Sequence, residues 1–170
     1  MWNKTLAAVL TFGLIGTTSS LVLYANELPG NAVSKLMPTA KVSLQEALRA
    51  AEDQGQPISG KFQVDEGHLQ LCVYTAKDGK FSQVLVDQNT GKVSKSQEIS
   101  AGTDLADAQK LMEAYSKSKI SLRAAVSKAE LAYPGYQAVS VTPTLSKGRP
   151  VAIVSLLQGT QTRSIAEPLG

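Results

Sequence analysis

The sequence predicts an α+β fold of two tandem units, each with one helix packed on a small antiparallel sheet, joined by a connecting helix. The first observation is a repeat: residues 41–52, KVSLQEALRAAE, recur as residues 119–130, KISLRAAVSKAE, at an offset of 78. The second is a change of apolar period after each copy, from that of a helix to that of a strand. The third is a series of glycine-containing turns between the alternating segments. We therefore expect a first unit at 41–98, a connector helix at 99–118 and a second unit at 119–170.

Composition excludes several classes of function. The chain has 170 residues, of which 43% are hydrophobic, and a formal net charge of +3. Its basic residues are not clustered, so a nucleic-acid partner is not expected. With the single cysteine Cys72, an internal disulfide and the usual multi-cysteine zinc sites are excluded, and any catalytic triad would have to use the single histidine, His68. We predict a surface position for His68, a half-buried strand position for Cys72, and no catalytic, cofactor-binding or metal-binding residues.

Residues 1–25 have the pattern of a signal peptide. Lys4 is followed by 21 uncharged residues, 5–25, which begin with an apolar core and end in a small residue. The alternative is an uncleaved anchor, because this stretch is just long enough to span a bilayer. Both interpretations place the rest of the chain outside the cytoplasm, either periplasmic or secreted. Residues 26–40 contain prolines and a glycine with little periodicity, so we expect a linker.

The first unit is predicted to begin with a helix. Ser43 and Glu46 have the spacing of a capping box. Four apolar residues then form one helical stripe: Leu44, Ala47, Leu48 and Ala51. Gly55 and Pro57 end the helix. Alternating residues predict strands at 61–64, 68–75 and 81–87, and Val93 as the start of a short return strand.

The connector is predicted to be a loop followed by a helix. Residues 94–102 are polar and are expected to form the loop. Thr103 or Asp104 is the expected cap of the helix, which ends near Ser116. Its apolar residues fall near one face, so we expect this helix to pack across a sheet.

The second unit resembles a shorter copy of the first. Ser121 is the expected cap of a helix with one apolar stripe: Leu122, Ala125, Val126 and Ala129. The segment Tyr133-Pro134-Gly135 ends this helix. Strands are predicted at 136–142, 151–157 and 160–167.

The end of the second unit is predicted to be clipped. Gly159 stands at an offset of 80 from Gly79, which places Glu167 where Asp87 stood. The sequence then stops at Gly170, before any equivalent of residues 91–93. We therefore expect an open sheet edge near residues 160–167, a feature that proteins usually cover.

The turn that closes the first unit resembles a family signature. Residues 86–93, VDQNTGKV, and the break at 132–136, AYPGY, are similar to the PepSY domain. The resemblance covers residues 41–170 as two copies, of which the second is degenerate. Asp87 suits a tight turn because aspartate can bond to its own backbone, and Gly91 can supply a positive φ. We therefore predict that the signature residues are structural.

The resemblance implies an exported, non-catalytic module that binds, modulates or inhibits an extracytoplasmic protein such as a peptidase. PepSY domains occur in the propeptides of secreted metallopeptidases. This chain has no His-Glu-x-x-His motif, so any action on a peptidase would be in trans. Membrane contact is expected only if residues 5–25 remain as an anchor.

Three functions are compared on this basis. The first is protein binding by addition of a strand to the open edge near residues 160–167. The second is an extracytoplasmic sensor of a small ligand or ion, with a pocket between the units or between helix and sheet. The third, an enzyme, has the least support, because no nucleophile, base and orienting group stand out and no cofactor is implied.

Overall fold

The computed structural model describes residues 30–170. The predicted signal peptide or anchor at 1–25, and residues 26–29 of the predicted linker, lie outside the described residues. Within residues 30–170, no helix is both long enough and apolar enough to cross a membrane.

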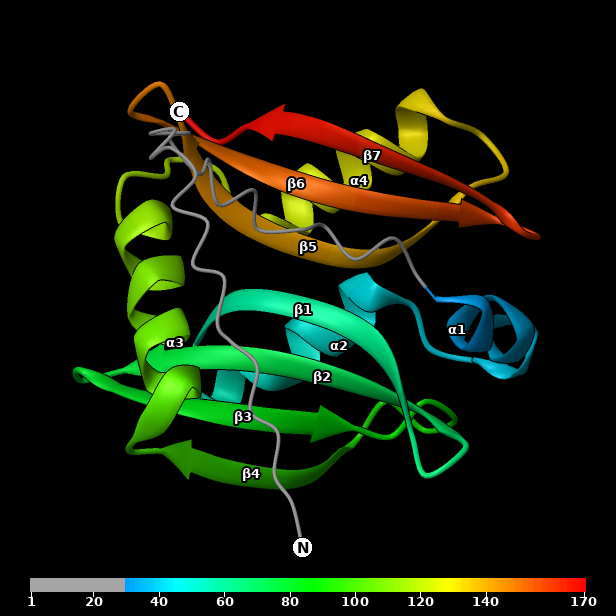
Figure 1. The fold of residues 1–170 in the computed structure, drawn as a ribbon, viewed down its shortest axis with the longest axis horizontal. Coiled ribbons are helices and arrows are strands. Elements are labelled where there is room, and N and C mark those ends of the chain that lie inside the picture. Colours follow the sequence, from blue (N-terminus) through cyan, green and yellow to red (C-terminus); the bar gives the residue numbers. More distant parts are fainter. Residues whose placement is uncertain (1–29) are drawn as a thin grey trace, which may run out of the picture.

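Seven antiparallel strands form one sheet, which confirms the α+β class. The strands are β1 Gln56–Asp65, β2 His68–Lys77, β3 Lys80–Val86, β4 Val93–Ile99, β5 Gln137–Ser146, β6 Arg149–Gln158 and β7 Gln161–Pro168. Their order across the sheet is β4-β3-β2-β1-β5-β6-β7 (Figure 1). The small sheets expected for the two units are therefore parts of one sheet. They meet where β1 pairs with β5, Gly60 opposite Val141 and Lys61 opposite Ser140.

Helices cover both faces of this sheet. On one face, α2 (Leu44–Ala51) and α4 (Leu122–Ala132) pack against each other, and the main core lies between them and the strands (Figure 1). On the other face lies α3 (Gly102–Tyr115), which contacts β1, β5 and β6 (Figure 1). A smaller core of Ile58, Phe81 and Ala108 holds α3 in place. The expectation that the connector helix packs across a sheet is confirmed.

The two predicted serine caps are present. In the capping box of α2, Ser43 Oγ accepts a bond from the Glu46 backbone N–H at 3.2 Å, while a Glu46 carboxylate oxygen accepts from the Ser43 backbone N–H at 2.7 Å. Ser121 Oγ accepts from the Ala124 backbone N–H at 3.1 Å. The apolar stripes of both helices are buried, as their spacing predicts.

Helical residues replace much of the predicted linker. Residues 31–39 form α1 (Asn31–Leu36) and the 3₁₀ turn η1 (Met37–Thr39). Val33 and Met37 are each 7% exposed and belong to the main core. The linker prediction is wrong for these residues. A helix of this length is too short to show clear periodicity or to be stable alone, so its stability comes from tertiary packing.

The segment between the third strand and α3 also differs from the prediction. Most of β4 was expected to be a loop. Its five central residues are all exposed, so no alternation of apolar and polar residues marks it as a strand. The N-cap of α3 is Ala101, which offers no side-chain bond, rather than Thr103 or Asp104.

Strand pairing corrects the predicted alignment of the two sheet halves by one residue. Lys77 pairs with Lys80 across the first hairpin turn, and Gln158 pairs with Gln161 across the second. The equivalent positions of β3 and β7 are therefore 81 residues apart rather than 80. As a result, Glu167 takes the position of the core residue Val86 instead of that of Asp87.

Candidate functional site

A cleft of about 380 Å³ lies where the two halves of the molecule meet. It is bounded by η1, the start of α2, the end of α4 and the start of β5. The residues that line it are Met37, Ala40, Lys41, Val42, Ser43, Glu46, Phe62, Glu130, Tyr136, Gln137 and Ala138. Its volume is at the lower end of the range for small-molecule sites, roughly 300–1,000 Å³. We call it the inter-helix cleft.

The Glu130 carboxylate is held in a fixed position at this cleft. One oxygen accepts a hydrogen bond from Gln45 Nε2 at 2.6 Å, and the other accepts from the backbone N–H of Ala138 at 2.8 Å. Gln45 is itself oriented by Ser127, whose hydroxyl donates to Gln45 Oε1 at 3.0 Å. Because these bonds join α2, α4 and β5, the position of Glu130 depends on contact between the two halves.

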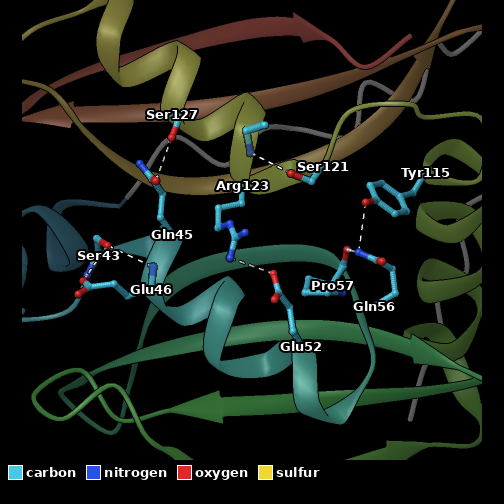
Figure 2. A network of polar contacts seen from close by, with 11 residues as sticks. Ser43, Gln45, Glu46, Glu52, Gln56, Pro57, Tyr115, Ser121, Arg123 and Ser127 are labelled. Carbon is cyan, nitrogen blue, oxygen red and sulfur yellow. Dashed lines mark hydrogen bonds and ion pairs between the residues drawn. The ribbon is translucent and has the colours of Figure 1, made fainter.

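A second contact joins α4 to Glu52, the residue that follows α2. Figure 2 shows Gln45 of α2 turned toward Ser127 of α4, and Arg123 of α4 turned toward Glu52. The Arg123 and Glu52 side chains are 3.2 Å apart but about half exposed, so this ion pair contributes little to stability.

The other charged groups of the cleft are less constrained. Bonds from the Ser43 backbone N–H and hydroxyl lower the pKa of the Glu46 carboxyl, so Glu46 stays ionised. Lys41 is also among the lining residues. Met37, Val42 and Phe62 supply an apolar surface. The cleft therefore suits a small ligand with both apolar and charged parts.

The signature turn lies outside the cleft and has a structural arrangement. Asp87 Oδ1 accepts bonds from the backbone N–H of Asn89 at 3.0 Å, and from the backbone N–H and the hydroxyl of Thr90 at 2.7 and 2.8 Å. These bonds, that of the Thr90 hydroxyl first, lower the pKa of the Asp87 carboxyl. Gly91 has a φ of +70°, which glycine adopts without strain. The turn also accepts the Lys41 backbone N–H at the Gln88 carbonyl, 3.0 Å away, and so supports the start of α2.

The single histidine and the single cysteine lie apart from the cleft. His68 is exposed at the start of β2, as predicted. Cys72 is 2% exposed, more buried than predicted, and burial raises the pKa of its thiol. Its sulfur accepts a bond from Gln83 Nε2 at 3.2 Å. Among residues 30–170, no group of three His, Cys, Asp or Glu side chains is arranged to hold a metal ion.

The open edge expected near residues 160–167 is an edge of the sheet. β7 ends the strand order, and no other strand of the described chain pairs with its outer side. Beside its start lies the arginine cluster, which we define as Tyr133, Tyr136 and Arg163. The Arg163 Cζ atom lies 5.4 Å from the centroid of each tyrosine ring. The hydrogen bond from Arg163 to the Tyr136 hydroxyl raises the pKa of the guanidinium, which stays charged.

Tyr136 connects the two surfaces, because it lines the inter-helix cleft and accepts a bond from Arg163 Nε at 3.2 Å. Sequence analysis did not identify Glu130, Tyr136 or Arg163 as site residues. Glu130 ends the repeated segment and Tyr136 ends the AYPGY break, but neither position carries a signal of its chemistry. Only the fold brings these three residues close together.

Comparison with known proteins identifies one segment of the chain. Residues 41–97 match the family model PepSY, described as "Peptidase propeptide and YPEB domain". No curated protein matches the chain. Among solved structures, that of a "putative lipoprotein" from Clostridium difficile 630 is similar, with 12% sequence identity, a TM-score of 0.43, and coverage of 76% of this chain and 88% of that chain. The PepSY match ends at residue 97, before α3, so the second, degenerate PepSY-like unit stays a prediction. Residues 41–97 are therefore identified as a PepSY domain.

Proposed function

We propose that this chain is an exported, non-catalytic binding module that modulates or inhibits an extracytoplasmic protein such as a peptidase. The observation that carries the proposal is the edge position of β7 in a protein with a PepSY domain: among residues 30–170, no second strand pairs with β7 besides β6. A partner segment in extended conformation would add to β7 as an eighth strand. Main-chain hydrogen bonds supply affinity in this mode of recognition, and side chains supply specificity.

The two ends of the sheet differ in a way that supports this mechanism. In the first half, the outer side of β3 is paired with β4. In the second half, β7 holds the place of β3, and no strand of the described chain holds the place of β4. An added partner strand would complete the second half on the pattern of the first.

A capture experiment with two matched variants tests the proposal. The full chain, kept in solution with mild detergent, is used as bait in an envelope extract, and retained proteins are identified by mass spectrometry. Thr162→Lys with Ala166→Lys charges the β7 edge. Ser96→Lys with Gln97→Lys adds the same charge to the β4 edge. Circular dichroism confirms that both variants are folded.

The expected result is a protein retained by the wild type and by the β4-edge variant and lost with the β7-edge variant. The activity of that protein is then measured with and without the chain. If all three baits retain the same proteins in the same amounts, binding through β7 is refuted.

A ligand sensor is the second candidate, and the inter-helix cleft favours it. A ligand that binds the native state alone would stabilise it, by about 2.7 kcal/mol at a hundredfold excess over Kd. Thermal unfolding is measured against a panel of small amphipathic ligands, with Glu130→Gln as the comparison variant. Ligand-induced stabilisation that is lost in Glu130→Gln would support the sensor, whereas an unchanged melting temperature across the panel would exclude it.

A further inference from the structure

The arginine cluster holds a positive charge in a defined position beside β7. Arg163 Nε donates to the Tyr136 hydroxyl at 3.2 Å, and that hydroxyl donates to Gln161 Oε1 at 3.1 Å. The rings of Tyr133 and Tyr136 are 6.3 Å apart in an edge-to-face arrangement, with an interplanar angle of 80°. The guanidinium is thus oriented by two rings and one hydroxyl, which reduces the entropy that a new contact would cost.

This charge has no acidic partner in the described part of the chain. The ion pairs there join Lys80 with Glu98, Lys110 with Asp107, Arg123 with Glu52 and Lys128 with Glu167. Arg163 forms none of them. Its bond to Tyr136 uses Nε, so the two outer nitrogens remain for an incoming group. Arginine presents such a pair of donors in the geometry that a carboxylate accepts.

The first half of the sheet shows where a residue of an added strand would lie. Counting from the hairpin turns, β3 and β7 are equivalent at an offset of 81, so Arg163 takes the position of Ser82. In β4, the residue directly opposite Ser82 is Glu98. A strand that pairs with β7 as β4 pairs with β3 would therefore place one side chain directly opposite Arg163, on the same face of the sheet.

We infer that the partner of the β7 edge is a protein segment with an acidic residue opposite Arg163. The inference rests on the proposed function and names the chemistry that the edge selects. Opposite charges that face each other on neighbouring strands attract, and like charges repel. The arginine cluster therefore sets both the register of the partner strand and its preference for Asp or Glu at one position.

Residues 92–100 of the chain itself, KVSKSQEIS, provide a probe, because this segment includes the strand that pairs with β3. As a free peptide, in the same register on β7, it would place its glutamate opposite Arg163. Three peptides are compared: the native one, one with Gln in place of this glutamate, and one with Lys. Binding to the full chain in mild detergent is followed by the amide shifts of ¹⁵N-labelled β7.

We expect the affinity for the peptides to follow the charge at position 163. Binding of the native peptide should weaken about three- to fivefold with Gln at that position or with Arg163→Gln, the size of a cross-strand charge pair. The Lys peptide should bind Arg163→Glu better than it binds the wild type. Equal binding of the Glu, Gln and Lys peptides would overturn the inference while leaving strand addition intact.

Two other outcomes are distinguishable from that one. If none of the three peptides shifts the β7 amides, the edge does not accept strands, and the proposed function fails together with the inference. If the full chain forms a dimer that Arg163→Gln and Glu98→Gln each dissociate, the occupant of the edge is a second copy of this chain, and the inference of a separate acidic partner is overturned. Light scattering measures this mass directly.

Discussion

Replacing Gly60 by alanine is expected to lower the free energy of unfolding, because this position lies where α2 comes closest to the sheet. A Cβ atom added at Gly60 would lie 3.0 Å from Leu48 Cδ2 and 3.2 Å from Leu44 Cδ1. Carbon atoms pack best at about 3.5–4.0 Å, so both leucines would have to move. Each is 1% exposed and belongs to the main core, so that movement would disturb packed neighbours.

The magnitude follows from two opposing effects. An added methyl group in a filled core costs about 1–3 kcal/mol. Replacing glycine by alanine recovers about 0.4–1 kcal/mol, because it restricts the unfolded chain. With the midpoints of these two ranges, about 2 and about 0.7 kcal/mol, the net loss is about 1.3 kcal/mol. For a chain of this size, that loss lowers Tm by roughly 3–5 °C.

Urea unfolding followed by circular dichroism measures this loss. Gly30→Ser is the control, because an added Cβ there meets no atom within 4 Å. Gly30 is the N-cap of α1, where Ser and Gly differ by only a few tenths of a kcal/mol, so this variant should be nearly as stable as the wild type. The double variant Gly60→Ala with Leu48→Ala removes the contact, so its loss should be at least about 0.5 kcal/mol smaller than the sum of the single losses. Full additivity, or a Gly60→Ala protein as stable as the wild type, would refute the packing argument.

Acid, ion-pair and thiol measurements test other parts of the structure. Folding lowers the pKa of the Asp87 carboxyl. The stabilisation from this carboxylate is therefore present above the unfolded pKa of about 3.9 and is lost as the pH falls through the folded pKa. Asp87→Asn should be less stable than the wild type at pH 7, and urea titrations in acid should show a smaller difference between the two. Lys128→Met removes the partner, at 2.8 Å, of the Glu167 carboxylate, whose side chain is 10% exposed. Thermal unfolding should show a loss of about 1–3 kcal/mol in the free energy of unfolding. Lys128→Met with Glu167→Gln should reduce this loss. Burial raises the pKa of the Cys72 thiol, so a thiol reagent should modify it at least about 100-fold more slowly in the native protein than in denaturant; equal rates would contradict its burial.

The helices on the main core could be predicted because their signals are local. Ser43 and Ser121 each precede an apolar stripe at helical spacing, and each forms the predicted cap. The hairpins are equally local, since glycine turns separate alternating residues. These features depend on neighbours within a few residues. The sequence therefore contains them in a directly recognisable form.

The elements that were missed depend on the rest of the fold. In β4, no alternation of apolar residues exists, because an edge strand with both faces exposed has no core to face. The short helix α1 and the turn η1 that follows it are stabilised by the burial of Val33 and Met37. Pairing of β1 with β5 involves only Gly60 and Lys61 on one side, and neither residue signals a strand junction.

The candidate site could not be predicted from the sequence for the same reason. Glu130 is held by Gln45, which is 85 residues away in the chain. Arg163 binds Tyr136 at a distance of 27 residues. Single residues of these types are common on protein surfaces, and no spacing rule connects them. Their chemistry follows from the joined sheet, which brings α2, α4, β5 and β7 together.

The one-residue correction of the register changes the interpretation of the open edge. In the alignment predicted from the sequence, at an offset of 80, Glu167 would be a turn residue like Asp87. In the structure, Glu167 lies on the core-facing side of the edge strand β7, where the residue is 7% exposed and forms an ion pair with Lys128. An inward-pointing charge on an edge strand disfavours indiscriminate pairing, because a competing arrangement would leave it unpaired. The β7 edge thus combines a charge that opposes nonspecific strands with Arg163, a charge that an acidic strand would neutralise. This combination is what an edge requires if it is to accept one partner without aggregating.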